Sequence, residues 1–267
     1  NAQGTAAVQL NVANAKAWSP EQPNLYTLEV SLYQGNKLAD RLRQRVGIRT
    51  VAVSKEHGFQ LNGQSRKFKG VCLHHDLGPL GAAVNKAAII RQIRLMKDMG
   101  VDAIRTSHNM PSQMQMQVCD SMGMMVMAES FDAWKEPKVK NGYNLFYDQW
   151  WRKDLENLIR GHRNHPSIVM WSIGNEIPEQ WNKEGAQRAK DMTDYCHQLD
   201  NTRPVTCGGD NPKANTECGF YAALDVPGFN YRVNLYDELI SKQPQGFILG
   251  SETTSTVSSR GGYKFPI

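Results

Sequence analysis

Two glutamates that end short apolar runs are the residues of this sequence best suited to catalysis. Glu176 ends the run Ile168–Glu176, and Glu252 ends the run Phe247–Glu252. Each run has the length and composition of a buried strand. Two carboxylates at strand ends can act as general acid and nucleophile on a glycosidic bond. Because a single strand-end Glu more often faces solvent, the assignment depends on the residues around this pair.

Polar residues follow an apolar run in six separate segments of the sequence. They are His74, His75, Asp76, Arg105, His108, Asn109, Glu129, Asp132, Trp134, Asn175, Glu176, Asn230, Tyr231 and Glu252. For any one of them a solvated loop position is the more common situation. Packing alone gives no reason for such residues to recur directly after six apolar runs, so we interpret them as one candidate site.

The chemical types of these residues suggest roles. A nucleophilic carboxylate must stay ionised, and the Arg105 guanidinium and the Tyr231 hydroxyl are natural partners that would hold Glu252 in that form. Glu176 follows the most apolar run, where burial would favour the protonated form that a proton donor needs. Asn175 can donate its amide to a sugar hydroxyl beside the reacting carbon. Trp134 offers a face for a pyranose ring, although simple packing of a buried tryptophan is as common.

The elements that carry these residues alternate between strand and helix from about Val51 onward. Strands are expected at 69–74, 103–106, 124–128, 168–175, 205–207, 226–231 and 247–251. Helices are expected after Asn85, from Pro111 to near Gly123, over 147–163 and over 184–199. Seven such units predict an α/β fold, a (β/α)8 TIM-type barrel with polar residues gathered at the carboxyl ends of its strands. An eighth unit is expected to begin near the end of the chain, after residues 258–262.

The first part of the sequence has a different pattern. Val8–Val12 and Leu25–Tyr33 alternate with period two, and Gln34–Lys37 resembles a hairpin turn. These features predict antiparallel strands of a β-sandwich, too few to complete one. We therefore expect residues 1–53 to be the C-terminal part of a sandwich domain and residues 54–267 to be a barrel truncated before its eighth unit, which makes the chain a piece of a longer protein.

Composition narrows the function class. The 267 residues contain 31 basic and 26 acidic side chains, scattered rather than clustered, which gives no sign of nucleic-acid binding. The sequence contains no stretch of about 18 apolar residues, so no membrane-spanning helix is expected. The five cysteines show no CxxC or other zinc spacing, so free thiols are expected. The sequence leaves homo-oligomer formation open.

Several motifs resemble glycoside hydrolase family 2, the β-galactosidase and β-glucuronidase group, whose proteins join an immunoglobulin-like sandwich to a catalytic barrel. The matching segments are Val46–Thr50, Gly70–Gly78, Ala103–Asn109, Phe131–Trp134, His165–Glu176 and Gly250–Thr253. The resemblance implies a retaining exo-β-glycosidase, with β-galactosides as the favoured substrate, and a periplasmic or secreted location. It also implies that Glu176 is the acid/base and Glu252 the nucleophile. By the same resemblance Arg105, His108, Asn175 and Tyr231 surround the reacting sugar, and His75 and Asp76 contact its hydroxyls.

Two departures from the family pattern affect the expected substrate and cofactor. The segment after the third strand, Glu129–Lys135, contains no His, whereas metal-dependent family members carry Glu and His there. No cofactor or metal is therefore expected. The Asn-x-Lys signature that resembles carboxylate recognition in glucuronidases is not evident, which lowers the expectation for glucuronides.

Two functions from other classes stay open at this point. The first is a metal-dependent barrel hydrolase that uses His74, His75, His108 and Asp132, which is weakened because adjacent strand residues point to opposite faces. The second is a carbohydrate-binding remnant without turnover, because an open barrel leaves strand edges unpaired. A different β-glycoside specificity, for a glucuronide or a mannoside, is the alternative within the leading hypothesis.

Overall fold

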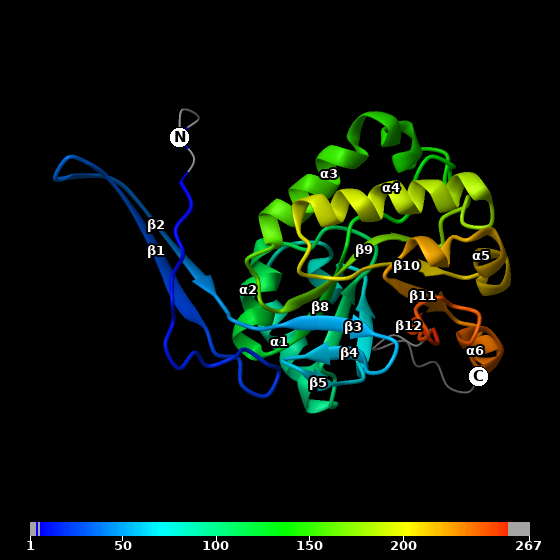
Figure 1. Cartoon of the computed structure of the whole chain (residues 1–267), viewed down its shortest axis with the longest axis horizontal. Helices are drawn as coiled ribbons and strands as arrows, with labels where there is room; N and C mark the ends of the chain where they lie inside the picture. The colour runs from blue at the N-terminus through cyan, green and yellow to red at the C-terminus, as the bar shows by residue number, and fades with distance from the viewer. Residues whose placement is uncertain (1–3, 5, 256–267) are drawn as a thin grey trace.

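The computed structural model describes residue 4 and residues 6–255, and its centre is a seven-stranded parallel sheet (Figure 1). The strands are β6 (Gly70–Leu73), β7 (Ala103–Thr106), β8 (Met125–Glu129), β9 (Ile168–Asn175), β10 (Val205–Gly209), β11 (Val226–Asn230) and β12 (Leu249–Glu252). They lie side by side in chain order from β6 to β12. The Cys72 thiol lies 3.4 Å from the Ser251 carbonyl oxygen, so the two outer strands of the described sheet approach each other. The sheet is a nearly closed TIM-type barrel, as predicted.

Helices follow most of these strands and cover the outside of the barrel (Figure 1). They are α1 (Lys86–Asp98), α2 (Gln113–Met122), α3 (Tyr147–His162), α4 (Lys183–Leu199), α5 (Pro212–Cys218) and α6 (Tyr236–Ile240). The predicted cap Asn85 accepts a hydrogen bond from the amide of Ala88. Helix α2 begins two residues later than predicted, because Ser112 rather than Pro111 caps it. Gly123 ends α2 in the left-handed conformation that glycine adopts without steric cost.

The core fills the space between the sheet and its helices. Its largest fully buried side chains include Trp134, Trp171, Phe220, Tyr221 and Phe229. Each aromatic side chain of this kind removes about 150–250 Å² from water, so the barrel is held chiefly by apolar burial. No helix among the described residues is long and apolar enough to cross a membrane. The predicted start of an eighth unit falls outside the described residues.

Three short antiparallel strands precede the barrel, before the first strand that the sequence analysis expected, at residues 69–74. They are β3 (Val51–Ser54), β4 (Gly58–Leu61) and β5 (Gln64–Ser65). An Asn62-Gly63 turn joins the last two, and both residues have positive φ, which is typical of a tight hairpin. Phe59 and Leu61 belong to the same buried cluster as residues at the starts of the barrel strands. The small sheet therefore covers the amino-terminal end of the barrel.

The N-terminal part contains one hairpin, formed by β1 (Tyr26–Gln34) and β2 (Lys37–Val46), which extends away from the barrel (Figure 1). The predicted turn at residues 34–37 is confirmed. The predicted strand at Val8–Val12 is wrong: this segment has no regular secondary structure, and Val8 and Leu10 are 80% and 67% exposed. Alternating apolar residues form a strand only beside a hydrogen-bonding neighbour, and the described residues supply none there.

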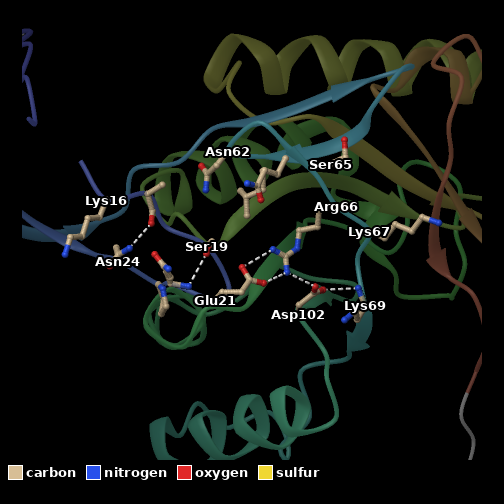
Figure 2. A pocket seen from close by; sticks show the side chains of 15 residues that line it. Lys16, Ser19, Glu21, Asn24, Asn62, Ser65, Arg66, Lys67, Lys69 and Asp102 are labelled. Atoms are coloured by element: carbon tan, nitrogen blue, oxygen red, sulfur yellow. Dashed lines mark hydrogen bonds and ion pairs between the residues drawn. The ribbon is translucent and has the colours of Figure 1, made fainter. Parts of the chain in front are cut away.

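A polar groove lies where the N-terminal segment meets the barrel (Figure 2). At its centre Nη2 of Arg66 lies 2.6 Å from Oε1 of Glu21 and 2.9 Å from Oδ2 of Asp102. The amide of Lys69 donates to Oδ1 of the same aspartate over 2.9 Å. The Arg66 hydrogen bonds lower the pKa of Glu21 to about 2. Because Lys69 and Asp102 directly precede strands β6 and β7, this groove lies at the end of the barrel opposite Glu176 and Glu252.

Candidate active site

Arg105 on β7 is the centre of a hydrogen-bond network inside the barrel. Its Nη2 lies 2.6 Å from Oε2 of Glu129, its Nη1 donates to Oε1 of Glu252 over 2.7 Å, and Nη2 also donates to Oδ1 of Asn175 over 2.9 Å. Burial disfavours the charged guanidinium, but the carboxylates of Glu129 and Glu252 outweigh this effect and raise the pKa of Arg105. The cation is therefore permanent, and it holds residues from three other strands.

Glu252, at the end of β12, is held by donors on both carboxylate oxygens. Arg105 donates to Oε1, and the Tyr231 hydroxyl donates to Oε2 over 2.7 Å. The Nε2 atom of His108 lies 3.8 Å from Oε1. A bond from Ser255 lowers the pKa of Tyr231, but the hydrogen bond to Glu252, together with desolvation and negative charge nearby, outweighs it and raises this pKa. The phenol thus remains a donor, and such donors favour the ionised form of a carboxylate.

Glu176 follows β9 directly and lies in the left-handed backbone region, with φ of 43°. Its amide donates to the Gly208 carbonyl over 2.7 Å, which fixes this unusual turn. Its Oε1 accepts a hydrogen bond from Nδ2 of Asn230 over 3.0 Å, and the same Nδ2 lies 2.9 Å from Oδ1 of Asn175. Since Asn175 also bonds to Arg105, both glutamates belong to one polar network.

Glu129, at the end of β8, is a residue of this network that the sequence analysis included among the strand-end residues but to which it assigned no role. Its side chain is fully buried. Oε1 lies 2.7 Å from Nδ1 of His108, and Oε2 accepts from the Ser172 hydroxyl over 2.6 Å as well as from Arg105. A fully enclosed carboxylate cannot meet a substrate, so Glu129 orients Arg105 and His108. The feature of the sequence that could have identified Glu129 is its position at the end of an apolar run.

Asp132 lies beyond β8, and it is exposed on one side. Its Oδ1 accepts from Nδ2 of Asn175 over 3.1 Å and from Nζ of Lys138 over 2.8 Å. Partial burial acts to raise the pKa of Asp132, but these two hydrogen bonds outweigh it and lower the pKa. Lys138 was not a sequence candidate, since nothing in its loop indicated which way it points.

Trp134 corrects one prediction. Its side chain is fully buried, its Nε1 donates to the Ile173 carbonyl over 2.7 Å, and its ring packs 5.9 Å from that of Phe220. The ring therefore presents no face to a sugar. The packing alternative is the correct one, because the indole satisfies its only donor inside the core.

The structure separates the two neighbouring histidines that follow β6, His74 and His75. His75 bonds through Nε2 to the Ala82 carbonyl, and Asp76 accepts from the Gly78 amide, so both are held within their own loop. His74 instead stacks edge-on against His108, with ring centroids 4.9 Å apart. Within residue 4 and residues 6–255, no group of three or more His, Cys, Asp or Glu side chains is arranged to hold a metal ion. The four proposed metal ligands thus do not form a cluster.

A cavity of about 1110 Å³ is lined by residues from both ends of the barrel, from Phe59 and Phe68 at one end to Glu252 at the other, and Glu176 is not on its wall. Other polar residues on its wall include His74, Arg105 and Tyr231. The site thus combines a largely buried carboxylate that is held by donors and lines the cavity, a second carboxylate on the same network and surrounding amides. This arrangement suits attack by one carboxylate and proton transfer by the other.

Comparison with known proteins identifies relatives along nearly the whole chain. The family model for glycosyl hydrolases family 2, TIM barrel domain, matches residues 51–265, and the model for glycosyl hydrolases family 2 matches residues 1–49. The β-galactosidase BoGH2A of Bacteroides ovatus is 36% identical over 97% of this chain. A putative β-glucuronidase of Formosa agariphila is 35% identical over 98% of it. A solved glycosyl hydrolase family 2 member from Bacteroides cellulosilyticus is 41% identical over 89% of the chain, with a TM-score of 0.82.

These relatives are much longer than this chain. The matched region covers 34% of the Bacteroides ovatus protein and 24% of the Formosa agariphila protein. It covers 32% of the Bacteroides cellulosilyticus chain. The chain thus spans about a third or less of the length of these relatives.

Proposed function

The chain belongs to glycosyl hydrolase family 2, and on this premise we propose that it carries the catalytic site of a retaining exo-β-glycosidase that acts on terminal β-galactosides. The observation that carries the proposal is the network that links Glu176 and Glu252 through Asn230, Asn175 and Arg105. We also propose that residues 1–53 end a sandwich domain and that residues 54–267 form the catalytic barrel.

In the proposed reaction Glu252 is the nucleophile. Its carboxylate attacks the anomeric carbon and forms a glycosyl ester, while Glu176 gives its proton to the departing glycosidic oxygen. The bonds from Arg105 and Tyr231 support this role, because they orient an ionised carboxylate toward the cavity. In the second step Glu176 takes a proton from water, whose oxygen attacks the anomeric carbon and releases Glu252. A retaining mechanism expects the two carboxyl groups roughly 5 to 5.5 Å apart.

The sugar would be held by the polar groups around the two glutamates. Asn175 has one amide hydrogen bonded to Asp132, which leaves its second amide hydrogen for a sugar hydroxyl. Asp132, His108 and His74 are further candidates for hydroxyl contacts, because each is at least partly exposed. Galactosides are favoured because the Bacteroides ovatus relative is named a β-galactosidase. Glucuronides are the second candidate, because the Formosa agariphila relative is named a putative β-glucuronidase.

A panel of 4-nitrophenyl β-glycosides tests this proposal. Galactoside, glucoside, glucuronide and mannoside would each be incubated with the protein, both as this chain and within a polypeptide of the length of its relatives. We expect the wild-type protein to release 4-nitrophenol from the galactoside and the Glu252→Gln variant to release none. Preferential release of 4-nitrophenol from the glucuronide would make a glucuronide the substrate and would leave the proposed mechanism unchanged. If a folded full-length protein hydrolysed none of the four glycosides, the proposed enzymatic function would be rejected and a carbohydrate-binding role favoured.

A further inference from the structure

Lys138 lies on the loop between β8 and α3 and reaches the end of β9. Its Nζ donates to the Asn175 carbonyl oxygen over 2.7 Å and to Oδ1 of Asp132 over 2.8 Å. The Asn175 carbonyl belongs to the peptide that joins this residue to Glu176. One ammonium group thus contacts the backbone directly before the glutamate that we propose as acid/base.

The same lysine also fixes the side chain of Asn175 through Asp132. Asn175 is 4% exposed, and its Nδ2 donates to the Asp132 oxygen that accepts from Lys138. Its Oδ1 accepts from Arg105 and Asn230, so the strand residue is bonded on both sides. Without the ammonium, the carbonyl of Asn175 and one oxygen of Asp132 would each lose a charged donor.

The loop that carries Lys138 is itself anchored near its base. Oε1 of the buried Glu179 accepts hydrogen bonds from the backbone amides of Lys135 and Glu136 over 3.1 and 3.4 Å. Burial raises the pKa of Glu179 in spite of these bonds. Glu179 lies three residues beyond Glu176, so the loop is attached to the same segment on two sides. Lys138 is therefore a fixed group rather than a freely rotating surface cation.

We propose that Lys138 is a positioning residue for the acid/base, which holds Asn175 and the peptide before Glu176 in the geometry needed for proton donation to the leaving group. This inference rests on the proposed function.

Leaving-group dependence separates this role from general damage to the fold. We compare Lys138→Met with Lys135→Met, a matched control on the same loop, whose ammonium pairs with Asp148 and whose side chain is 45% exposed. For a methyl glycoside, which needs protonation, Lys138→Met should lower kcat/KM by roughly 10- to 100-fold through misplacement of the acid. For a 2,4-dinitrophenyl glycoside, whose leaving group needs no proton, the loss should be less than about threefold. Lys135→Met should match the wild type with both substrates.

The leaving-group comparison is a readout that a purely structural role would not change, because damage to the fold slows both substrates alike. Equal losses for both leaving groups would overturn the proposal.

A crystal structure of Lys138→Met keeps the question separate from the proposed function. We expect the Asn175 amide and the peptide before Glu176 to rotate relative to the wild type, and an unchanged position of both would overturn the proposal even if no glycoside were hydrolysed. If the wild-type protein hydrolysed none of the glycosides, the proposed function would be rejected, and the structural part of this inference would still be tested by the crystal structure. Wild-type turnover with Lys138→Met equal to Lys135→Met would reject this inference alone.

Discussion

The Arg105 guanidinium and the Glu252 carboxylate lie 2.7 Å apart, with only 3% and 11% of their side chains exposed. The same guanidinium contacts Glu129, whose side chain has no exposed surface. The fully buried carboxylate of Glu129 and the largely buried carboxylate of Glu252 therefore share one cation, and the desolvation of all three groups is offset only while the contacts are complete. The pair is consequently a point where stability and the proposed chemistry depend on the same atoms.

Arg105→Met should destabilise the protein by about 3–5 kcal/mol, because it leaves two carboxylates without their counter-charge. The control is Arg43→Met on the hairpin, where Arg43 and Glu29 are 2.6 Å apart but 64% and 38% exposed. An exposed pair contributes little to stability, because water and salt screen the attraction between its charges. Urea denaturation of both variants measures the difference. Equal free energies of unfolding for the two variants would contradict the importance assigned to burial.

Tyr231→Phe should reduce kcat/KM by roughly 10- to 100-fold, because a hydrogen bond to a charged group contributes about 1.5–3 kcal/mol. The phenol donates to Oε2 of Glu252, and its loss leaves that oxygen with one donor fewer for the proposed attack. Steady-state kinetics on the preferred aryl glycoside measures the effect. Tyr236→Phe is the control, because its buried hydroxyl has no hydrogen-bond partner among the described residues. A comparable loss in that variant would show that the effect is not specific to Glu252.

Glu252→Gln should abolish covalent labelling by a 2-fluoro-glycoside inactivator, while Glu176→Gln should still be labelled. The 2-fluoro sugar lets the ester with the nucleophile accumulate, and an activated leaving group makes the acid dispensable. Peptide mass spectrometry locates the label. A label on any residue other than Glu252 would refute the assignment of the nucleophile.

The sequence predicted the strands and the polar residues at their ends, because buried parallel strands are short apolar runs and their ends are marked by Arg105, Asn175 or Glu252. It did not predict which side chain points inward. Trp134 was expected at the sugar and lies in the core, since an aromatic residue has the same signature in both places. His74, not His75, stacks on His108, and this choice depends on strand orientation. Lys138 could not be found, because its contacts depend on the path of an irregular loop.

His162 should make stability depend on pH between its folded and unfolded pKa values. Burial, and then the charge of His165, lower the pKa of His162 to about 4, against 6.5 for an unperturbed histidine. Above pH 6.5 both states are neutral and stability is complete. As pH falls from 6.5 to 4, His162 is protonated in the unfolded state but stays neutral in the folded state. The free energy of unfolding therefore decreases by up to about 3 kcal/mol.

Urea denaturation from pH 4 to pH 8 tests this dependence on His162. His162→Leu should lose less stability than the wild type over the acidic part of the range. His57→Leu serves as the control, because His57 is exposed in a surface turn and its replacement should keep the wild-type slope. Identical slopes for the wild type and His162→Leu would show that His162 does not cause the acid sensitivity.

Gly208→Ala should lower kcat/KM by roughly 100-fold, because misplacement of about 1 Å can cost that much. A methyl group on Gly208 would lie 2.8 Å from Nη2 of Arg105, 2.8 Å from Oδ1 of Asn230 and 3.3 Å from Oδ1 of Asn175. Arg105 and Asn230 are buried and bonded on several sides, so they cannot move without breaking the network that links the two glutamates.

The control for Gly208→Ala is Gly161→Ala in α3. The nearest atom to its new methyl group would be Nε2 of Gln113 at 3.5 Å, an ordinary contact. Alanine is favoured over glycine in a helix by up to about 1 kcal/mol, so this variant should be fully active and slightly more stable. Kinetics and urea denaturation of both variants separate the two effects. Full activity of Gly208→Ala would mean that the contacts among Arg105, Asn175 and Asn230 are not required for turnover.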